Sequence, residues 1–148
     1  MLESVVLVCN DFGAMRKTKD KPVSIRLLAH DYDALSEQAK RRGSRIGTLS
    51  AELVSRSIRQ ISHPAICFQD TADGGYCARI CGHRVSVWVV VDTLMQLGGD
   101  ARKAAECLNL SVPLVLAAQT YAAEFPDEIE ADMRLGKRDL KESHLAAA

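Results

Sequence analysis

The chain lacks the features of a membrane protein or a secreted protein. Its apolar start, residues 2–8, is too short to span a bilayer and has no basic residue before it, unlike a signal peptide. The cysteine count is five, and an odd number argues against a disulfide framework. We therefore expect a cytoplasmic protein with no membrane partner.

Motifs of catalysis are also missing. The sequence has no phosphate-binding glycine loop, no paired-carboxylate motif and no family pattern that sets a serine or cysteine nucleophile beside a histidine. Cys67, Cys77, Cys81 and His83 offer four zinc ligands in principle, but they lack the close cysteine pair of a structural zinc site. We predict no enzymatic activity, no metal and no cofactor.

Positive charge is concentrated in one part of a chain whose net charge is zero. Residues 15–62 contain 11 basic and 5 acidic residues, a net charge of +6. Residues 63–148 contain 8 basic and 12 acidic residues, a net charge of −4. This asymmetry suggests a nucleic-acid-binding module joined to a second domain.

The basic part contains a short alternating strand followed by two helical patterns. The apolar side chains of Val23, Ile25 and Leu27 alternate with the polar side chains of Ser24 and Arg26, so the two sets point to opposite faces of a strand. A lone strand leaves its backbone groups unpaired. Pairing with a second copy gives a homodimer whose two-stranded ribbon rests its apolar face on the helices.

Capping residues and periodicity predict where the two helices lie. Asp31 is expected to cap the first helix and Gly43 to stop it. Ile46 is expected to fill the core between the helices, and Gly47 or Thr48 to begin the second one. The predicted inner stripe of the second helix is Leu49, Leu53, Val54 and Ile61, with Arg56 and Arg59 on its outer side.

This segment resembles the ribbon-helix-helix family, the class of the Arc and MetJ repressors. The resemblance implies a dimer that reads operator DNA with the outward residues of the strand, here Ser24 and Arg26. It also implies a phosphate contact at the start of the second helix, here Gly47 and Thr48. The basic arm before the strand is expected to bind phosphates of any sequence through Lys17, Lys19 and Lys21.

The second domain is predicted to be helical after an initial β-hairpin. The hairpin strands are residues 65–68 and 76–80, and a buried helix follows from Trp88 to Leu97. Two further helices, capped by Asp100 and Ser111, have the outline of a helix-turn-helix. The second of them begins with the apolar Val112, Pro113 and Leu114, so we expect protein contact or core packing rather than base reading.

This region is similar to the small domain of VapB-type antitoxins, which pair with PIN-like ribonuclease toxins. The similarity rests on residues 82–88, the turn at 108–111 and the run at 121–129. It implies an antitoxin of a type II pair that represses its own operon and neutralises its toxin; the alternative is a stand-alone repressor. The predicted toxin contact is an acidic helix, although a solvated surface helix explains it equally well: Asp127, Glu128, Glu130 and Asp132.

The predicted fold is therefore mainly α with short β-structure, in four parts. Residues 1–20 form a flexible or untranslated segment with the basic arm, and Met15 is a candidate start. Residues 21–62 form the ribbon-helix-helix module, and residues 63–134 form the β-hairpin and helix-turn-helix-like domain. Residues 135–148 are expected to be a frayed tail.

Overall fold

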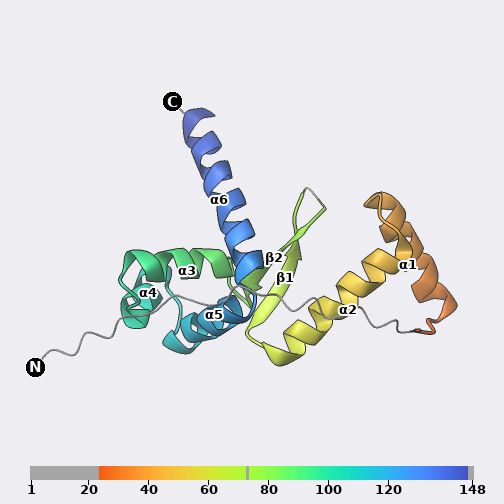
Figure 1. The fold of residues 1–148 in the computed structure, drawn as a ribbon, viewed down its shortest axis with the longest axis horizontal. Coiled ribbons are helices and arrows are strands. Elements are labelled where there is room, and N and C mark those ends of the chain that lie inside the picture. Colours follow the sequence, from red (N-terminus) through yellow and green to blue (C-terminus); the bar gives the residue numbers. More distant parts are fainter. Residues whose placement is uncertain (1–23, 73, 147–148) are drawn as a thin grey trace, which may run out of the picture.

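The computed structural model describes residues 24–72 and 74–146, with side chains up to Asp139. Over these ranges the chain is mainly helical with one two-stranded antiparallel sheet, which confirms the predicted mainly α fold with short β-structure. Figure 1 shows the helices that precede the sheet along the chain on one side of it, and the helices that follow the sheet on the other side. In chain order the elements are α1 (Ala29–Arg41), α2 (Ile46–Ser62), β1 (Ile66–Asp70), β2 (Tyr76–Ile80), α3 (Val87–Gln96), α4 (Ala101–Leu108), α5 (Val112–Glu124) and α6 (Pro126–Ala146).

Helices α1 and α2 form a hairpin around a sharp turn. Helix α1 begins at Ala29 with Leu28 as its N-cap, so the prediction that Asp31 caps it is wrong. Asp31 lies in the first turn instead, where the helix dipole favours a carboxylate. Gly43 has φ +61°, which confirms it as the left-handed residue that ends this helix. Helix α2 then begins at Ile46, one residue earlier than predicted.

The β-hairpin is the element that joins the two helical parts. Its strands pair in register from Ile66↔Ile80 to Asp70↔Tyr76, and their bounds agree within two residues with the predicted strands 65–68 and 76–80. Side chains alternate across a strand, and the inward ones at Ile66, Ala78 and Ile80 have no exposed surface. One face of the hairpin therefore belongs to the core of the second domain.

Helices α3, α4 and α5 supply most of that core. Val87 and Val90 of α3 and Val115 and Tyr121 of α5 are fully buried in one cluster with the hairpin residues. Asp100 caps α4 as predicted. Its Oδ1 accepts hydrogen bonds from the backbone N–H groups of Arg102 and Lys103, both at 3.1 Å. Apolar burial of this kind, roughly 25 cal/mol per Å², is the main force that holds the domain together.

Helix α6 differs from the prediction most. It continues to Ala146, so the expected frayed tail at 135–148 is wrong for residues 135–146. Its backbone packs closely on Trp88, because a Cβ at Gly136 would lie 2.7 Å from Cε2 of the indole. Lys137 Nζ also pairs with Asp92 Oδ1 of α3 at 2.6 Å. These tertiary contacts stabilise the later turns of the acidic helix, which the sequence predicts from Asp127 towards Arg138.

Within the part of the chain that the structure describes, none of the helices combines the length and the apolar character needed to cross a lipid bilayer.

Candidate functional site

The described ribbon residues lie just before α1 and have no regular secondary structure in the single chain. Ser24, Ile25, Arg26 and Leu27 are all exposed, and no strand is assigned among them in the single chain. Ile25 has 56% of its surface in water, which is high for an isoleucine. Val23 lies outside the described residues, as do Lys17, Lys19 and Lys21. Pairing of this segment with a second copy stays a prediction.

Helix α2 exposes most of the stripe that was predicted to be its inner face. Leu49 is buried, but Leu53 and Val54 are exposed and Ile61 is 81% exposed, so the predicted stripe is wrong for three of its four residues within one chain. The helical spacing places these side chains and Ile58 on one side of α2. We call the exposed apolar residues of this part of the chain the apolar face; they are Ile25, Leu27, Leu28, Tyr32, Leu53, Val54, Ile58 and Ile61.

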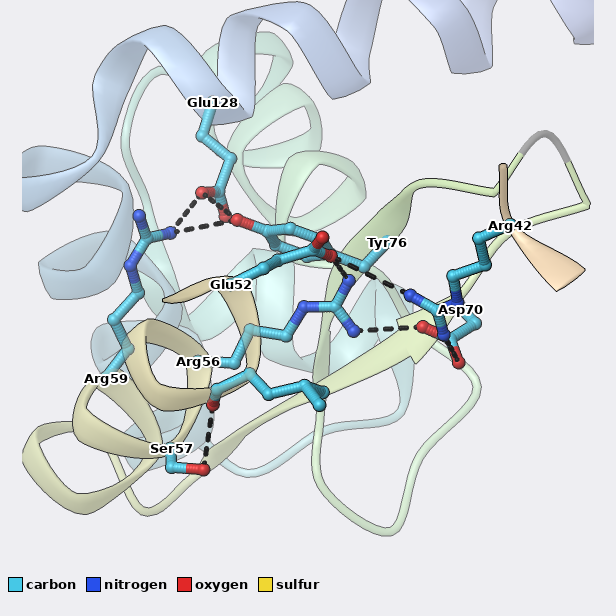
Figure 2. A network of polar contacts seen from close by, with 9 residues as sticks. Arg42, Glu52, Arg56, Ser57, Arg59, Asp70, Tyr76 and Glu128 are labelled. Carbon is cyan, nitrogen blue, oxygen red and sulfur yellow. Dashed lines mark hydrogen bonds and ion pairs between the residues drawn. The ribbon is translucent and has the colours of Figure 1, made fainter. Parts of the chain in front are cut away.

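The opposite side of α2 carries arginines that the sequence analysis placed in solvent. Arg56 is only 8% exposed, which overturns that placement. Its guanidinium donates to Asp70 Oδ1 of β1 at 2.9 Å and to Glu52, and it stacks 3.8 Å above the ring centre of Tyr76. Arg42 donates to the other oxygen of Asp70 at 2.7 Å. Figure 2 shows these side chains reaching from the helix pair to the hairpin.

Arg59, about one helical turn after Arg56, connects α2 to α6. It pairs with Glu128 of α6, and its guanidinium lies 4.3 Å from the ring centre of Phe125 (Figure 2 shows the pair with Glu128). The hydroxyl of Tyr121 donates to Glu128 Oε1 at 2.7 Å. We call this set the arginine cluster: Arg42, Glu52, Arg56, Arg59, Asp70, Tyr76, Tyr121 and Glu128.

The arginine cluster keeps its charged groups charged. Burial opposes the charge of Arg59, but hydrogen bonds with Tyr121 and Glu128 outweigh it and raise the pKa of the guanidinium. Burial, together with Glu128, raises the pKa of the Tyr121 hydroxyl, which therefore stays protonated and donates. The hydrogen bond from Arg56 lowers the pKa of Asp70. Asp70 of β1 and Glu128 of α6 thus face Arg56 and Arg59 of α2 across the boundary between the two parts.

The four acidic residues of the predicted toxin contact lie in two different environments on α6. Asp127 and Glu130 are exposed on α6, whereas Glu128 turns inward to Arg59 and Asp132 is half-buried. Burial raises the pKa of Asp132, and the charge of Glu128 adds to this effect. The prediction of four exposed acidic side chains is therefore wrong for Glu128 and Asp132, because α6 packs that side against the hairpin and the core.

The start of α2, predicted to contact phosphate, is open to solvent. Gly47 and Thr48 are exposed, and Arg45, the N-cap residue, makes no side-chain hydrogen bond to the first turn. A Cβ at Gly47 would meet nothing within 4 Å. The first backbone N–H groups of a helix have no partner within the helix. This turn and the exposed Arg26 are therefore accessible to a large anionic partner.

The cysteines and histidines do not gather into a metal site in the described residues, where no group of three or more His, Cys, Asp or Glu side chains is placed to hold an ion. Cys67 and Cys77 are half-buried on the two strands of the hairpin, Cys81 is half-buried in the turn that follows β2, and Cys107 is exposed. Burial raises the pKa of the thiols of Cys77 and Cys81, which disfavours the thiolate that binds metals or reacts as a nucleophile. Arg84 is exposed beside this turn.

No protein-family model matches this chain, and comparisons with curated proteins and with solved structures also find no match. The apolar face, the start of α2 and the arginine cluster are the features of this chain that indicate a function.

The arginine cluster is the feature that the sequence analysis missed. The spacing of Glu52, Arg56 and Arg59 places their side chains along one side of α2, and this pattern predicts a charged side of the helix. The partners were not predictable in the same way, because Glu128 lies 69 residues from Arg59 along the chain. Contacts at such separations depend on the fold rather than on local pattern.

Proposed function

We propose that this protein is a DNA-binding homodimer of ribbon-helix-helix type. The observation that carries the proposal is the apolar face. A segment with exposed Ile25 and Leu27 precedes two helices, and the second helix exposes a further apolar stripe. Monomeric proteins rarely leave a large contiguous apolar patch in water, and such a patch marks an interface. A second copy with the same face would cover it symmetrically and pair the two extended segments.

DNA contact in this proposal uses the surfaces that dimerisation leaves open. A two-stranded ribbon fits the major groove, where Arg26 can pair with a guanine and Ser24 can bind either edge. The N–H groups at Gly47 and Thr48, at the start of α2, suit a phosphate. Because Arg42, Arg56 and Arg59 are already paired with acids, phosphate binding depends on the other basic residues, which include the arm lysines.

The role of the second domain in the proposal is to bind a toxin, so that the whole protein acts as an antitoxin that represses its own operon. This part rests on the resemblance to VapB-type antitoxins and on the acidic surface that remains. Asp127 and Glu130 are exposed and suit the basic groove expected of a PIN-like ribonuclease. The apolar residues at the start of α5 offer no donors for base edges, which favours a protein partner.

The DNA half is tested by titrating labelled DNA from upstream of the protein's own coding sequence, with a scrambled duplex beside it. Arg26→Ala should reduce the preference for the specific duplex by about 1–3 kcal/mol, because a bidentate contact with guanine is lost. Lys19→Ala should weaken binding to both duplexes alike and lower the slope of log K against log salt by about 1. Arg84→Ala, at an exposed arginine of the second domain, is the matched control. An unchanged preference in Arg26→Ala contradicts the assigned face of the ribbon.

The toxin half is tested with the full chain and the product of the adjacent gene, if that gene encodes a small PIN-like nuclease. Reversing the charge of Asp127 and Glu130 together to lysine should slow capture of the nuclease at low salt and leave DNA binding intact. A chain that binds DNA but does not inhibit or capture this nuclease is instead the stand-alone repressor.

A further inference from the structure

Helix α2 has different neighbours on its two sides. Arg56 and Arg59 face the hairpin and α6, which belong to the second domain. Ile58 is exposed and, at 3.6 residues per turn, lies about 200° around the helix from Arg56. One helix therefore forms part of the apolar face and, on its other side, the boundary with the second domain.

The second domain determines how α2 is oriented. Arg56 is buried and reaches Asp70 and the ring of Tyr76, and its charge has no comparable partners within the helix pair apart from Glu52. Removing one partner of a buried ion pair leaves an uncompensated charge, which is far more costly than losing a surface pair. Rotation of α2 away from the hairpin would separate Arg59 from Glu128 and would leave Arg56 with Glu52 as its remaining acidic partner, so these contacts hold the apolar face in one orientation.

We propose that the arginine cluster couples the two parts of the chain, by fixing α2 in the orientation in which its apolar face meets a second copy. The second domain thereby strengthens dimerisation and DNA binding without contacting the second copy or the DNA. This effect on dimerisation and DNA binding rests on the proposed function. Coupling of this kind is reciprocal, so pairing of two copies should in turn tighten the arginine cluster. The helix α2 is the physical element that both contacts share.

The direct test is amide hydrogen exchange on the full chain with Glu128→Gln, compared with Glu130→Gln. Both variants remove one negative charge from α6, but Glu130 has a side chain 68% exposed and contacts Arg134 of its own helix at 3.7 Å. In Glu128→Gln we expect the amides of α2 to exchange about tenfold faster or more, with those of α3 and α5 unchanged. In Glu130→Gln we expect no change in either part.

Arg59→Met tests the same contact from the α2 side and keeps an apolar chain over Phe125. It decides the question if Glu128→Gln does not fold. Unchanged exchange in α2 overturns the proposal. An equal increase in the amide exchange rates of α2, α3 and α5 also overturns it, because the arginine cluster would then contribute only to the global stability of the chain.

Sedimentation equilibrium separates this proposal from the proposed function. Glu128→Gln and Arg59→Met should each raise the dimer dissociation constant by about tenfold, whereas Glu130→Gln should leave it unchanged. A wild-type chain that stays monomeric contradicts the proposed function, and selective acceleration of α2 would still support the coupling. A wild-type dimer of unchanged strength in both variants contradicts the coupling and leaves the proposed function standing.

Discussion

The two parts of this chain satisfy their apolar side chains in different ways. In the second domain, residues from the hairpin and from α3 to α6 meet in one buried cluster that includes Val90, Val115 and Tyr121. In the helix pair, Ala39 and Leu49 are the buried apolar residues among those described, and the apolar face remains in water. The second domain buries a core within one chain, whereas no residue that the structure describes covers the apolar face of the helix pair.

Size explains this difference. Two short helices and the segment before them enclose too little volume to bury a core, and small domains of this kind usually depend on oligomerisation or another staple. The hairpin covers only the polar side of α2, through the arginine cluster. The contact between the parts is therefore electrostatic and aromatic in character, and it leaves the apolar face of the helix pair exposed among the described residues.

Ile25→Lys should have the largest effect, because it breaks the apolar face where the two copies are proposed to meet. An unpaired ammonium in a buried interface costs several kcal/mol, so we expect the dimer dissociation constant to rise by about a hundredfold or more, with loss of DNA binding. Sedimentation equilibrium measures the first effect. Met95→Lys, at a residue of the second domain with similar exposure, should leave the dimer unchanged. A variant Ile25→Lys that still dimerises normally rules out the ribbon interface.

Gly136→Ala should have a smaller effect and should act on the second domain. The added methyl group would clash with the indole of Trp88, and overpacking of this kind costs about 1–3 kcal/mol. Chemical unfolding followed by fluorescence of Trp88, the one tryptophan, measures the change. Gly47→Ala is the control in the helix pair: its Cβ meets open space, so α2 should be stabilised by up to about 1 kcal/mol. Equal destabilisation by both variants would show that Trp88 does not set the cost.

Asp132→Asn should have the smallest effect, and its sign should depend on pH. Because burial raises the pKa of Asp132 in the folded chain, its contribution to stability is present in acid and is lost as pH rises through the raised value. At neutral pH the asparagine variant should therefore be the more stable protein, and the difference should shrink as pH falls below the ordinary range for aspartate.

Thermal unfolding of both proteins from about pH 4 to about pH 8 measures this difference. The lowered pKa of Asp70 has the opposite consequence, a loss of stability as pH falls, but it is common to both proteins and cancels in the comparison. A stability difference between the two proteins that stays constant across this pH range would mean that folding does not raise the pKa of Asp132.

Most of the local structure was predictable from the sequence. The two hairpin strands, the stop at Gly43 and the cap at Asp100 follow from residues a few positions apart. Local rules were less reliable at the start of α1, where Leu28 precedes the expected cap by three residues, and at α6, whose length depends on packing against Trp88. Of the candidate site, the exposure of Arg26 and of the start of α2 agreed with expectation.

The sequence by itself determined which residues form helices and strands, because capping, glycine conformation and hydrophobic period act over a few residues. Only the tertiary structure decided which side of α2 and α6 is buried. Helix α2 has an apolar side and a charged side, and local pattern favours burial of the apolar one, so the burial of its charged side depends on partners far along the chain. Arg59 and Glu128, 69 residues apart, select one side of each helix by pairing across the boundary, and that choice leaves the apolar face of α2 in water.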